Sequence, residues 1–462
     1  MRAPLSTAAL TLAALVVAGV GSAQSLPGTW VGTWLRDGAS LPVTMRFERS
    51  ATGYRGTFDA EALRAVEIPL SDIAYNPPTV KWRVVGDATT SEFEGTLAGQ
   101  RLEGRFADGD ARGRFVLQRA PNSPLRATRE IVTFSNGTVS LAGTVIVPPG
   151  PGPHPGIVFL HGSGPEGRWA SFFLAEQFAA RGFVALCFDK RGVGDSGGDW
   201  RHATPADLAS DGAAAVAALA ARPDVSPGRI GIHGHSQGGF LAPLTAARIG
   251  APAFVIASGA GGVPAGEMEA YSIENEIGVP RMTDAEAHDA RAFVAALVAT
   301  AYGGAPRDSL LSVYASIRSR SWAFEPPPAS DPYWNFSRQL AAYDPLAFWQ
   351  RVSAPTLLVY GEADERVPPR RSAARIAAAY LDGSGASIEV LVLPHADHSF
   401  RIPPAAGTSF AWPVTAPGYP AQLVDWALRQ VSTSTPRAVA NRPLPAGRAR
   451  STQPGLDAAH VP

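Results

Sequence analysis

The stretch Gly231–Phe240 reads GIHGHSQGGF and places Ser236 between two glycines, Gly234 and Gly238. It continues the apolar run RIGIH and leads into FLAPLTAARIG, whose apolar residues recur with a helical period. A strand that turns at once into a helix forces the turning residue into a strained backbone, and only small neighbours leave room for it. The stretch therefore predicts a serine hydroxyl exposed above a sheet, beside a helix N-terminus that suits an anion formed during reaction.

Compact apolar runs extend on both sides of this turn, and helical patterns separate most of them. Continuous apolar strands spaced by helices predict a parallel sheet with helices on both faces, an α/β fold. A hairpin turn at Asn136-Gly137 opens the region. Ligands of such folds bind at the carboxyl ends of the strands, so the residues after each run are candidates for a site. The runs are GIVFL, FVALCF, RIGIH, AFVIAS, TLLVY and IEVLVL.

Acidic and basic residues follow the last two of these runs. A serine nucleophile needs a base that takes its proton, and the base needs an acid that holds its tautomer. Glu362, Asp364 and Glu365 come after TLLVY, and Asp364, near the middle of the turn, is the candidate acid. His395 and His398 come after IEVLVL. His398 has more chain in which to reach back over the sheet and is the candidate base, with His395 as the alternative.

Two glycine-rich loops, at 162–167 and 192–197, match the G-x-G-x-x-G pattern of dinucleotide sites. The strand before the first loop is not the first of its domain, and Pro165 lies inside that loop, so we expect no nucleotide cofactor. The segment His395–His398 lacks a third spaced histidine or cysteine nearby, so we expect no metal.

These residues resemble the α/β-hydrolase family, above all bacterial serine esterases that are dienelactone-hydrolase-like or acyl-peptidase-like. The resemblance covers about residues 130–432. The segments that carry it are HGSGP at 161–165, FDKRGVGDSGG at 188–198, GHSQGG at 234–239, YGEAD at 360–364 and ADHSF at 396–400.

The resemblance implies a role for each site residue. Ser236 would be the nucleophile, Asp364 the acid and His398 the base, with the backbone amides of Ser163 and Gln237 as the oxyanion hole. The implied activity is hydrolysis of carboxylic esters through an acyl-enzyme, without cofactor or metal. A serine peptidase, or an acyltransferase or thioesterase, could use the same three residues. A binding protein with an inactive site is a third interpretation.

Short alternating runs broken by Gly, Asp and Asn fill about residues 25–120 and predict a small all-β module, a barrel or a sandwich. A glycine two positions before a large side chain recurs through this region. Each copy can bury one such side chain, so we interpret these as the core of the module rather than a ligand platform. The copies end at Trp30, Trp34, Phe58, Leu97, Phe106 and Phe115.

Residues of about 262–350 separate two strands by far more chain than a crossover helix needs. Helical stretches and aromatic residues in this insertion predict a lid over the serine and an apolar pocket, although the rings could instead pack the insertion onto the sheet. The hydrolase domain is expected over 125–432. The tail 433–462 is rich in Pro, Arg, Ser and Ala without periodicity, so we expect it to be disordered.

The composition restricts the partners and the compartment. Of 462 residues, 45% are hydrophobic and 17% charged, and the net charge is zero, so we expect a small-molecule ester rather than nucleic acid. A charge, a short apolar segment and small residues mark 1–23 as a signal peptide, predicting a periplasmic or secreted protein without stable membrane insertion. The single cysteine, Cys187, rules out an intrachain disulfide.

Overall fold

A computed structural model of the protein describes residues 25–86, 89–121, 127–383 and 386–433. The chain divides into two compact units, the first made mainly of residues before Ser123 and the second of those after it. The predicted signal peptide 1–23 and nearly all of the predicted tail 433–462 lie outside the described residues.

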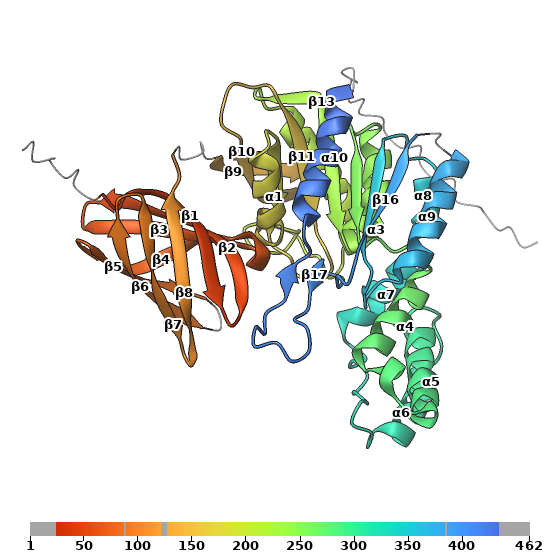
Figure 1. Ribbon diagram of the computed structural model, residues 1–462. Helices are drawn as coiled ribbons and strands as arrows, with labels where there is room; N and C mark the ends of the chain where they lie inside the picture. The colour runs from red at the N-terminus through yellow and green to blue at the C-terminus, as the bar shows by residue number, and fades with distance from the viewer. Residues whose placement is uncertain (1–24, 87–88, 122–126, 384–385, 434–462) are drawn as a thin grey trace, which may run out of the picture. The chain divides into compact units, whose positions relative to one another are not determined.

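The first unit is a closed antiparallel β-barrel (Figure 1). Each strand pairs with its neighbour in sequence, and pairing of the first strand with the last closes the barrel. The predicted all-β module is therefore confirmed, as a barrel rather than a sandwich. Its strands are β1 (Gly28–Arg36), β2 (Ala39–Ser50), β3 (Gly53–Ala60), β4 (Ala65–Asn76), β5 (Thr79–Val85), β6 (Thr90–Ala98), β7 (Arg101–Asp108) and β8 (Ala111–Arg119), with a 3₁₀ turn at Glu61–Leu63.

Aromatic side chains fill the inside of the barrel. Trp34 packs edge-on against Phe58 and Phe106, with ring centroids 5.8 and 5.1 Å away. Trp82 stacks on Phe93 at 5.2 Å. Alternation along each strand sends every second side chain inward, which is why so many rings meet. The large residues of the recurring glycine unit are all buried: Trp30, Trp34, Phe58, Leu97, Phe106 and Phe115.

One ion pair is buried in the barrel. Arg36 Nη1 donates to Asp108 Oδ2 at 2.5 Å, and both side chains are less than a tenth exposed. Thr89 and Ser91 hydroxyls donate to the same oxygen. Burial alone would raise the pKa of Asp108, but the hydrogen bonds from Arg36, Thr89 and Ser91 outweigh it and lower this pKa. Three donors thus stabilise the charged form of the carboxylate.

The second unit is built on an eight-stranded sheet with the order β16-β15-β14-β13-β11-β12-β10-β9. All neighbours from β16 to β12 are parallel, and β10 and β9 join as an antiparallel hairpin. The predicted α/β fold class is thereby confirmed. The strands are β9 (Thr128–Asn136), β10 (Val139–Val147), β11 (His154–Leu160), β12 (Val184–Phe188), β13 (Val225–His235), β14 (Val255–Ser258), β15 (Thr356–Gly361) and β16 (Ile388–Leu393).

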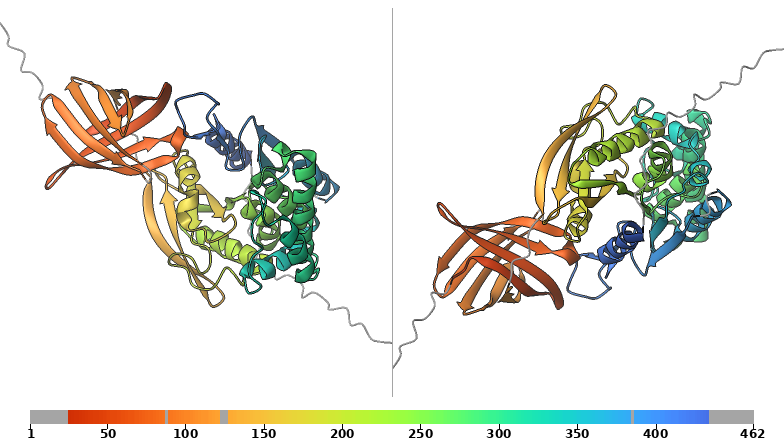
Figure 2. Two further views of the ribbon diagram at one scale, coloured as in Figure 1. Left: turned by 90° about the horizontal axis from the view of Figure 1, so that it is seen from below. Right: turned by 90° about the horizontal axis from the view of Figure 1, so that it is seen from above.

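Helices cover both faces of this sheet (Figure 2). On one face α1 (Phe172–Ala179) lies against α10 (Tyr419–Thr433). On the other, α2 (Pro205–Ala220) packs against α3 (Gln237–Ile249), and α9 (Pro369–Gly383) packs on β15 and β16. The five residues of β12 are all buried, as a strand covered on both faces requires.

The chain between β14 and β15 forms the helical insertion, made of α4 (Ala265–Glu276), α5 (Asp284–Ala301), α6 (Arg307–Ile317), α7 (Pro332–Ala341) and α8 (Leu346–Trp349), with a 3₁₀ turn at Val279–Arg281. Its aromatic residues divide between two environments. Trp334 belongs to a core of the insertion itself, whereas Trp349 is packed into the core of the sheet. Tyr343 contacts Phe240 of α3, with ring centroids 4.9 Å apart. No helix in the described part of the chain is long and apolar enough to cross a membrane.

The buried pair of the barrel gives a stability prediction. Asp108→Ala removes the 2.5 Å partner of the buried Arg36 and leaves its 3.3 Å contact with Asp37, so we expect the free energy of unfolding to fall by about 3 kcal/mol. The carboxylate has a lowered pKa, so the wild-type advantage is complete above its ordinary value of 3.8 and declines as the pH falls through the lowered value.

Urea unfolding at pH 7 and pH 3 measures this difference. The control is Glu48→Ala, which breaks an exposed pair with Arg55 and should cost at most about 1 kcal/mol. Equal losses in the two variants would contradict the assignment of the buried pair.

Candidate active site

Ser236 lies at the turn where β13 ends and α3 begins. Its φ of 54° and ψ of −116° are outside the regions that a serine ordinarily adopts. The two flanking glycines are required by close packing. A Cβ on Gly234 would lie 2.2 Å from the carbonyl oxygen of Gly238, and one on Gly238 would lie 2.7 Å from that of Leu160. The strained strand-to-helix turn that the sequence predicts is therefore present.

The backbone of this turn is fixed by the neighbouring strand. The Ser236 N–H donates to the carbonyl oxygen of Ser258, the last residue of β14, at 2.9 Å. The Ser236 carbonyl in turn accepts from the N–H of Phe240 at 2.9 Å, which starts α3. The side chain is half-buried, and among the described residues no hydrogen bond engages its hydroxyl. The hydroxyl is thus free to meet another group.

His398 and Asp364 are in direct contact. His398 Nδ1 and Asp364 Oδ2 are 2.8 Å apart, and the carboxylate is almost completely buried. The other oxygen of Asp364 accepts the backbone N–H groups of Arg366 and Val367, each at 2.8 Å. These bonds fix the carboxylate in its turn. The carboxylate then fixes the plane of the imidazole and leaves Nε2 for another partner.

His398 also lies beside the residue that precedes Ser236. His235 Nε2 is 3.0 Å from the carbonyl oxygen of His398, and the two rings are 4.9 Å apart. Gly259 directly follows Ser258, the residue that bonds the Ser236 N–H. The His398 ring lies close to Gly259, because a Cβ on this glycine would be 2.9 Å from His398 Cε1. His398 and Asp364 thus meet beside Gly259, just after β14, and Ser236 lies at the neighbouring carboxyl end of β13.

The alternative base, His395, and the other histidines near the site have different surroundings from His398. His395 is 82% exposed, and its nearest acidic group is Glu362, 3.9 Å away. Burial lowers the pKa of His161 and of His233 to about 3, and that of His235 to about 4. These three rings are consequently neutral at pH 7. His161 Nε2 bonds the carbonyl of Phe188 at 2.5 Å, as a residue packed beside the following loop would.

Gln237 and Ser163, the predicted oxyanion residues, lie on two segments that approach each other. Gln237 is the first residue of α3, where the N–H has no acceptor within the helix. Ser163 belongs to the loop 161–167, which follows β11. Lys190 connects these segments. Its Nζ donates to the carbonyls of Gly162 at 2.5 Å and Gly164 at 2.7 Å, on both sides of Ser163.

Lys190 also donates to Gln237 Oε1 at 3.1 Å, so one ammonium holds both segments. It is 2% exposed, and burial lowers its pKa to about 8. Glu166 supports the same loop, because its Oε2 accepts the N–H of Gly162 at 2.6 Å. We call these contacts of Lys190 and Glu166 the clamp. We did not predict a role for Lys190 from the sequence. The one clue in the sequence was that Lys190 comes soon after β12. This strand lies next to β11, and β11 leads into the loop 161–167.

The charges on either side of Lys190 face away from this clamp. Asp189 bonds Arg168 through both oxygens, and Arg191 forms a two-bond pair with Asp211. The first pair ties the end of β12 to the segment after the loop 161–167, and the second ties the chain after β12 to α2. Within the described ranges, no cluster of three or more His, Cys, Asp or Glu side chains has the arrangement to hold a metal ion.

The fold agrees with comparison to known proteins. Residues 157–406, more than half of the chain, match the model of the alpha/beta hydrolase family. The protein belongs to the alpha/beta hydrolase family. The resemblance expected from the sequence is therefore confirmed.

Two curated relatives match parts of the chain. Esterase EstD of Thermotoga maritima is 30% identical over 115 residues, 23% of this chain and 27% of the esterase. Quorum-quenching protein AidA of Acinetobacter baumannii is 34% identical over 134 residues, 28% of this chain and 42% of that protein. The matches thus span less than half of each relative. The family match supports a hydrolase, and one of these two relatives is named as an esterase.

Solved structures similar to the chain include the 2,6-dihydroxy-pseudo-oxynicotine hydrolase, with a TM-score of 0.43 and 18% identity over 70% of this chain and 73% of that one. A Pyrococcus furiosus esterase has a TM-score of 0.42 and 17% identity, over 68% of this chain and 94% of that one.

The clamp gives a second prediction. Lys190→Met removes the donor shared by Gly162, Gly164 and Gln237. The backbone amides of Ser163 and Gln237 would then lose their positions, so we expect kcat for a nitrophenyl ester to fall ~100-fold. The matched control is Lys81→Met, at the only other lysine, which is exposed on the barrel and should leave kcat unchanged.

A pH series provides a second readout. The pKa of Lys190 is about 8 in the folded chain, against an ordinary 10.5. Between these values the unfolded chain binds more protons, so wild-type stability should rise with pH relative to Lys190→Met. Unchanged kcat in the methionine variant would contradict the role of the clamp.

Proposed function

We propose that the protein is a serine hydrolase that cleaves small carboxylic esters through Ser236, His398 and Asp364, with an acyl-enzyme intermediate. The observation that carries this proposal is the 2.8 Å contact between His398 and Asp364 beside the strained turn at Ser236. A buried acid that orients a histidine, with a serine hydroxyl at a nearby strand end, supports activation of that serine as a nucleophile.

In the proposed mechanism, His398 Nε2 takes the proton of Ser236 Oγ as this oxygen attacks the ester carbonyl. Asp364 keeps the proton on Nδ1 and stabilises the imidazolium that forms. The backbone amides of Ser163 and Gln237 bind the oxyanion of the tetrahedral intermediate. The proton then passes to the leaving alcohol. Water repeats the sequence on the acyl-enzyme and releases the acid.

The choice of an ester over an amide rests on the relative that is named as an esterase. The helical insertion would shape the acyl or alcohol pocket and act as the lid, and residues 1–23 would direct the protein to the periplasm or the exterior. Neither the formation of the acyl-enzyme nor its hydrolysis requires a cofactor.

Hydrolysis of nitrophenyl esters of increasing acyl length, with the matching anilides, tests the proposal. We expect esters to be cleaved much faster than anilides, with Ser236→Ala at the background rate. His398→Ala and Asp364→Asn should lower kcat by about 10⁴-fold, since the base is lost or takes the wrong tautomer.

His395→Ala is the matched control, because this exposed histidine lies on the same loop and should be dispensable. Retention of activity in His398→Ala would refute the proposed base. Anilide cleavage at rates comparable with esters would favour a peptidase.

A further inference from the structure

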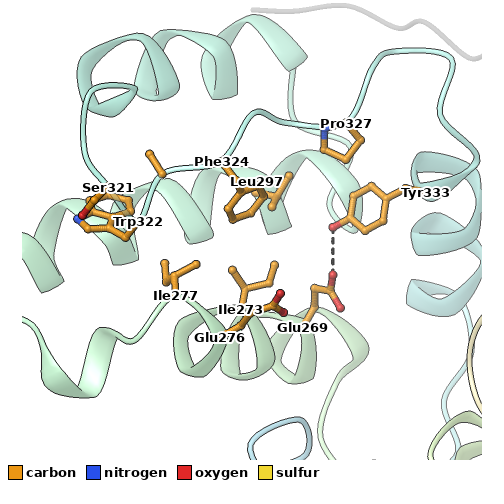
Figure 3. Close-up of a pocket in the computed structure, with 11 residues that line it drawn as sticks. Glu269, Ile273, Glu276, Ile277, Leu297, Ser321, Trp322, Phe324, Pro327 and Tyr333 are labelled. Carbon is orange, nitrogen blue, oxygen red and sulfur yellow. Dashed lines mark hydrogen bonds between the residues drawn. The ribbon is translucent and has the colours of Figure 1, made fainter. Parts of the chain in front are cut away.

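The helical insertion contains a cavity of about 720 Å³ that is open to solvent (Figure 3). Helix α4 lines one side of it, and Leu297 of α5, the segment 321–327 and Tyr333 of α7 line the others. This volume is within the range of cavities that bind organic molecules. The cavity is lined entirely by the insertion, and none of the residues proposed for ester hydrolysis contributes to its wall.

The lining combines apolar walls with negative charge. Ile273, Leu297, Trp322 and Phe324 belong to the apolar part, and the charged groups are Glu269 and Glu276. None of the lining residues, all of which are described, is a lysine, arginine or histidine. An anion would therefore be repelled, whereas a cation with an apolar body would match both parts of the wall.

Glu269 differs from the other glutamates of α4. Glu267 pairs with Arg371, Glu274 with Arg291 and Glu276 with Arg366. Within the described part of the chain Glu269 forms no ion pair.

The carboxylate of Glu269 instead accepts a hydrogen bond from the Tyr333 hydroxyl, with the two oxygens 3.3 Å apart (Figure 3). Burial raises the pKa of Glu269, and hydrogen bonds from Tyr333 and Tyr302 oppose this rise only in part. The Glu269 carboxyl thus faces a largely apolar cavity without an ion pair of its own, and Arg366 acts on it only through the longer-range attraction of its charge.

We propose that this cavity binds an organic ammonium ion, with its charged head against Glu269 and its apolar body against the wall of Ile273, Leu297, Trp322 and Phe324. The head would form a charge-assisted hydrogen bond with the carboxylate, which is stronger than a neutral one. The rings of Trp322, Phe324 and Tyr333 add faces that attract a cation.

Helix α4 also contacts the loop of the candidate acid. The Tyr271 hydroxyl donates to the carbonyl of Asp364 at 2.8 Å, and Asn275 Nδ2 donates to that of Glu365 at 3.2 Å. A ligand that binds Glu269 therefore engages the helix that supports this loop. The ammonium can be a free molecule or a group of the ester itself, and the binding step does not depend on the proposed function.

Calorimetric titration of the full chain carrying Ser236→Ala tests the proposal without turnover. The probes are 4-phenylbutylamine, 4-phenylbutanol and 4-phenylbutanoate, which share one apolar body. We expect the amine, protonated at pH 7, to bind at least about tenfold more tightly than the alcohol, and the carboxylate to bind most weakly.

Glu269→Gln should remove the preference for the amine, whereas Glu274→Gln, on the same helix but outside the cavity lining, should retain it. Trp322→Ala should weaken amine and alcohol alike, so the wall is tested even if Glu269→Gln fails to fold. Absence of saturable binding, equal affinity for amine and alcohol, or a preference that survives Glu269→Gln would overturn the proposal.

Inhibition of the wild-type chain distinguishes the two sources of the ammonium. Competition by 4-phenylbutylamine against a neutral ester, with faster turnover of an ester that carries an amine, assigns the cavity to the substrate. A change in kcat without competition assigns it to a separate molecule. If the chain hydrolyses no ester, the titration still decides the binding proposal.

Discussion

Strand β13 gives way to helix α3 within a single residue, and that constraint sets the geometry of the site. Ser236 can hold its positive φ only because the backbones of Gly234 and Gly238 approach more closely than any side chain would allow. The same turn brings the N-terminus of α3 to the edge of the sheet. A hydroxyl and a backbone N–H donor are therefore presented together, before any other group contributes.

Two buried charged groups then organise the surroundings of this turn. On one side Asp364, held by two backbone amides, orients His398. On the other side Lys190 ties the loop after β11 to Gln237. Charges are costly to bury unless they are partnered, and each of these has its partners in the site itself. Each charged group therefore fixes the loops that it bonds, and those loops in turn fix the position of the charged group.

The sequence predicted those features that depend on neighbouring residues. The apolar runs, the hairpin at Asn136-Gly137 and the turn at Ser236 are encoded locally, and the structure contains them. Closure of the barrel requires β1 to pair with β8, about 80 residues later, so alternation alone left barrel and sandwich open. The contacts of Lys190 and Glu269 likewise join distant segments, and no spacing in the sequence reveals them. The roles of Ser236, Asp364 and His398 stay predictions until they are measured.

The proposal that His398 activates Ser236 is tested most directly by locating the residue to which an organophosphonate becomes attached. The intact chain would be treated with a fluorophosphonate, and the modified residue located by peptide mass spectrometry in wild type and in His398→Ala. We expect a single adduct on Ser236 that forms rapidly in wild type and at least about 100-fold more slowly without the imidazole. A chain that hydrolyses esters while its adduct lies on another residue, or forms at the same rate without His398, would contradict the proposal.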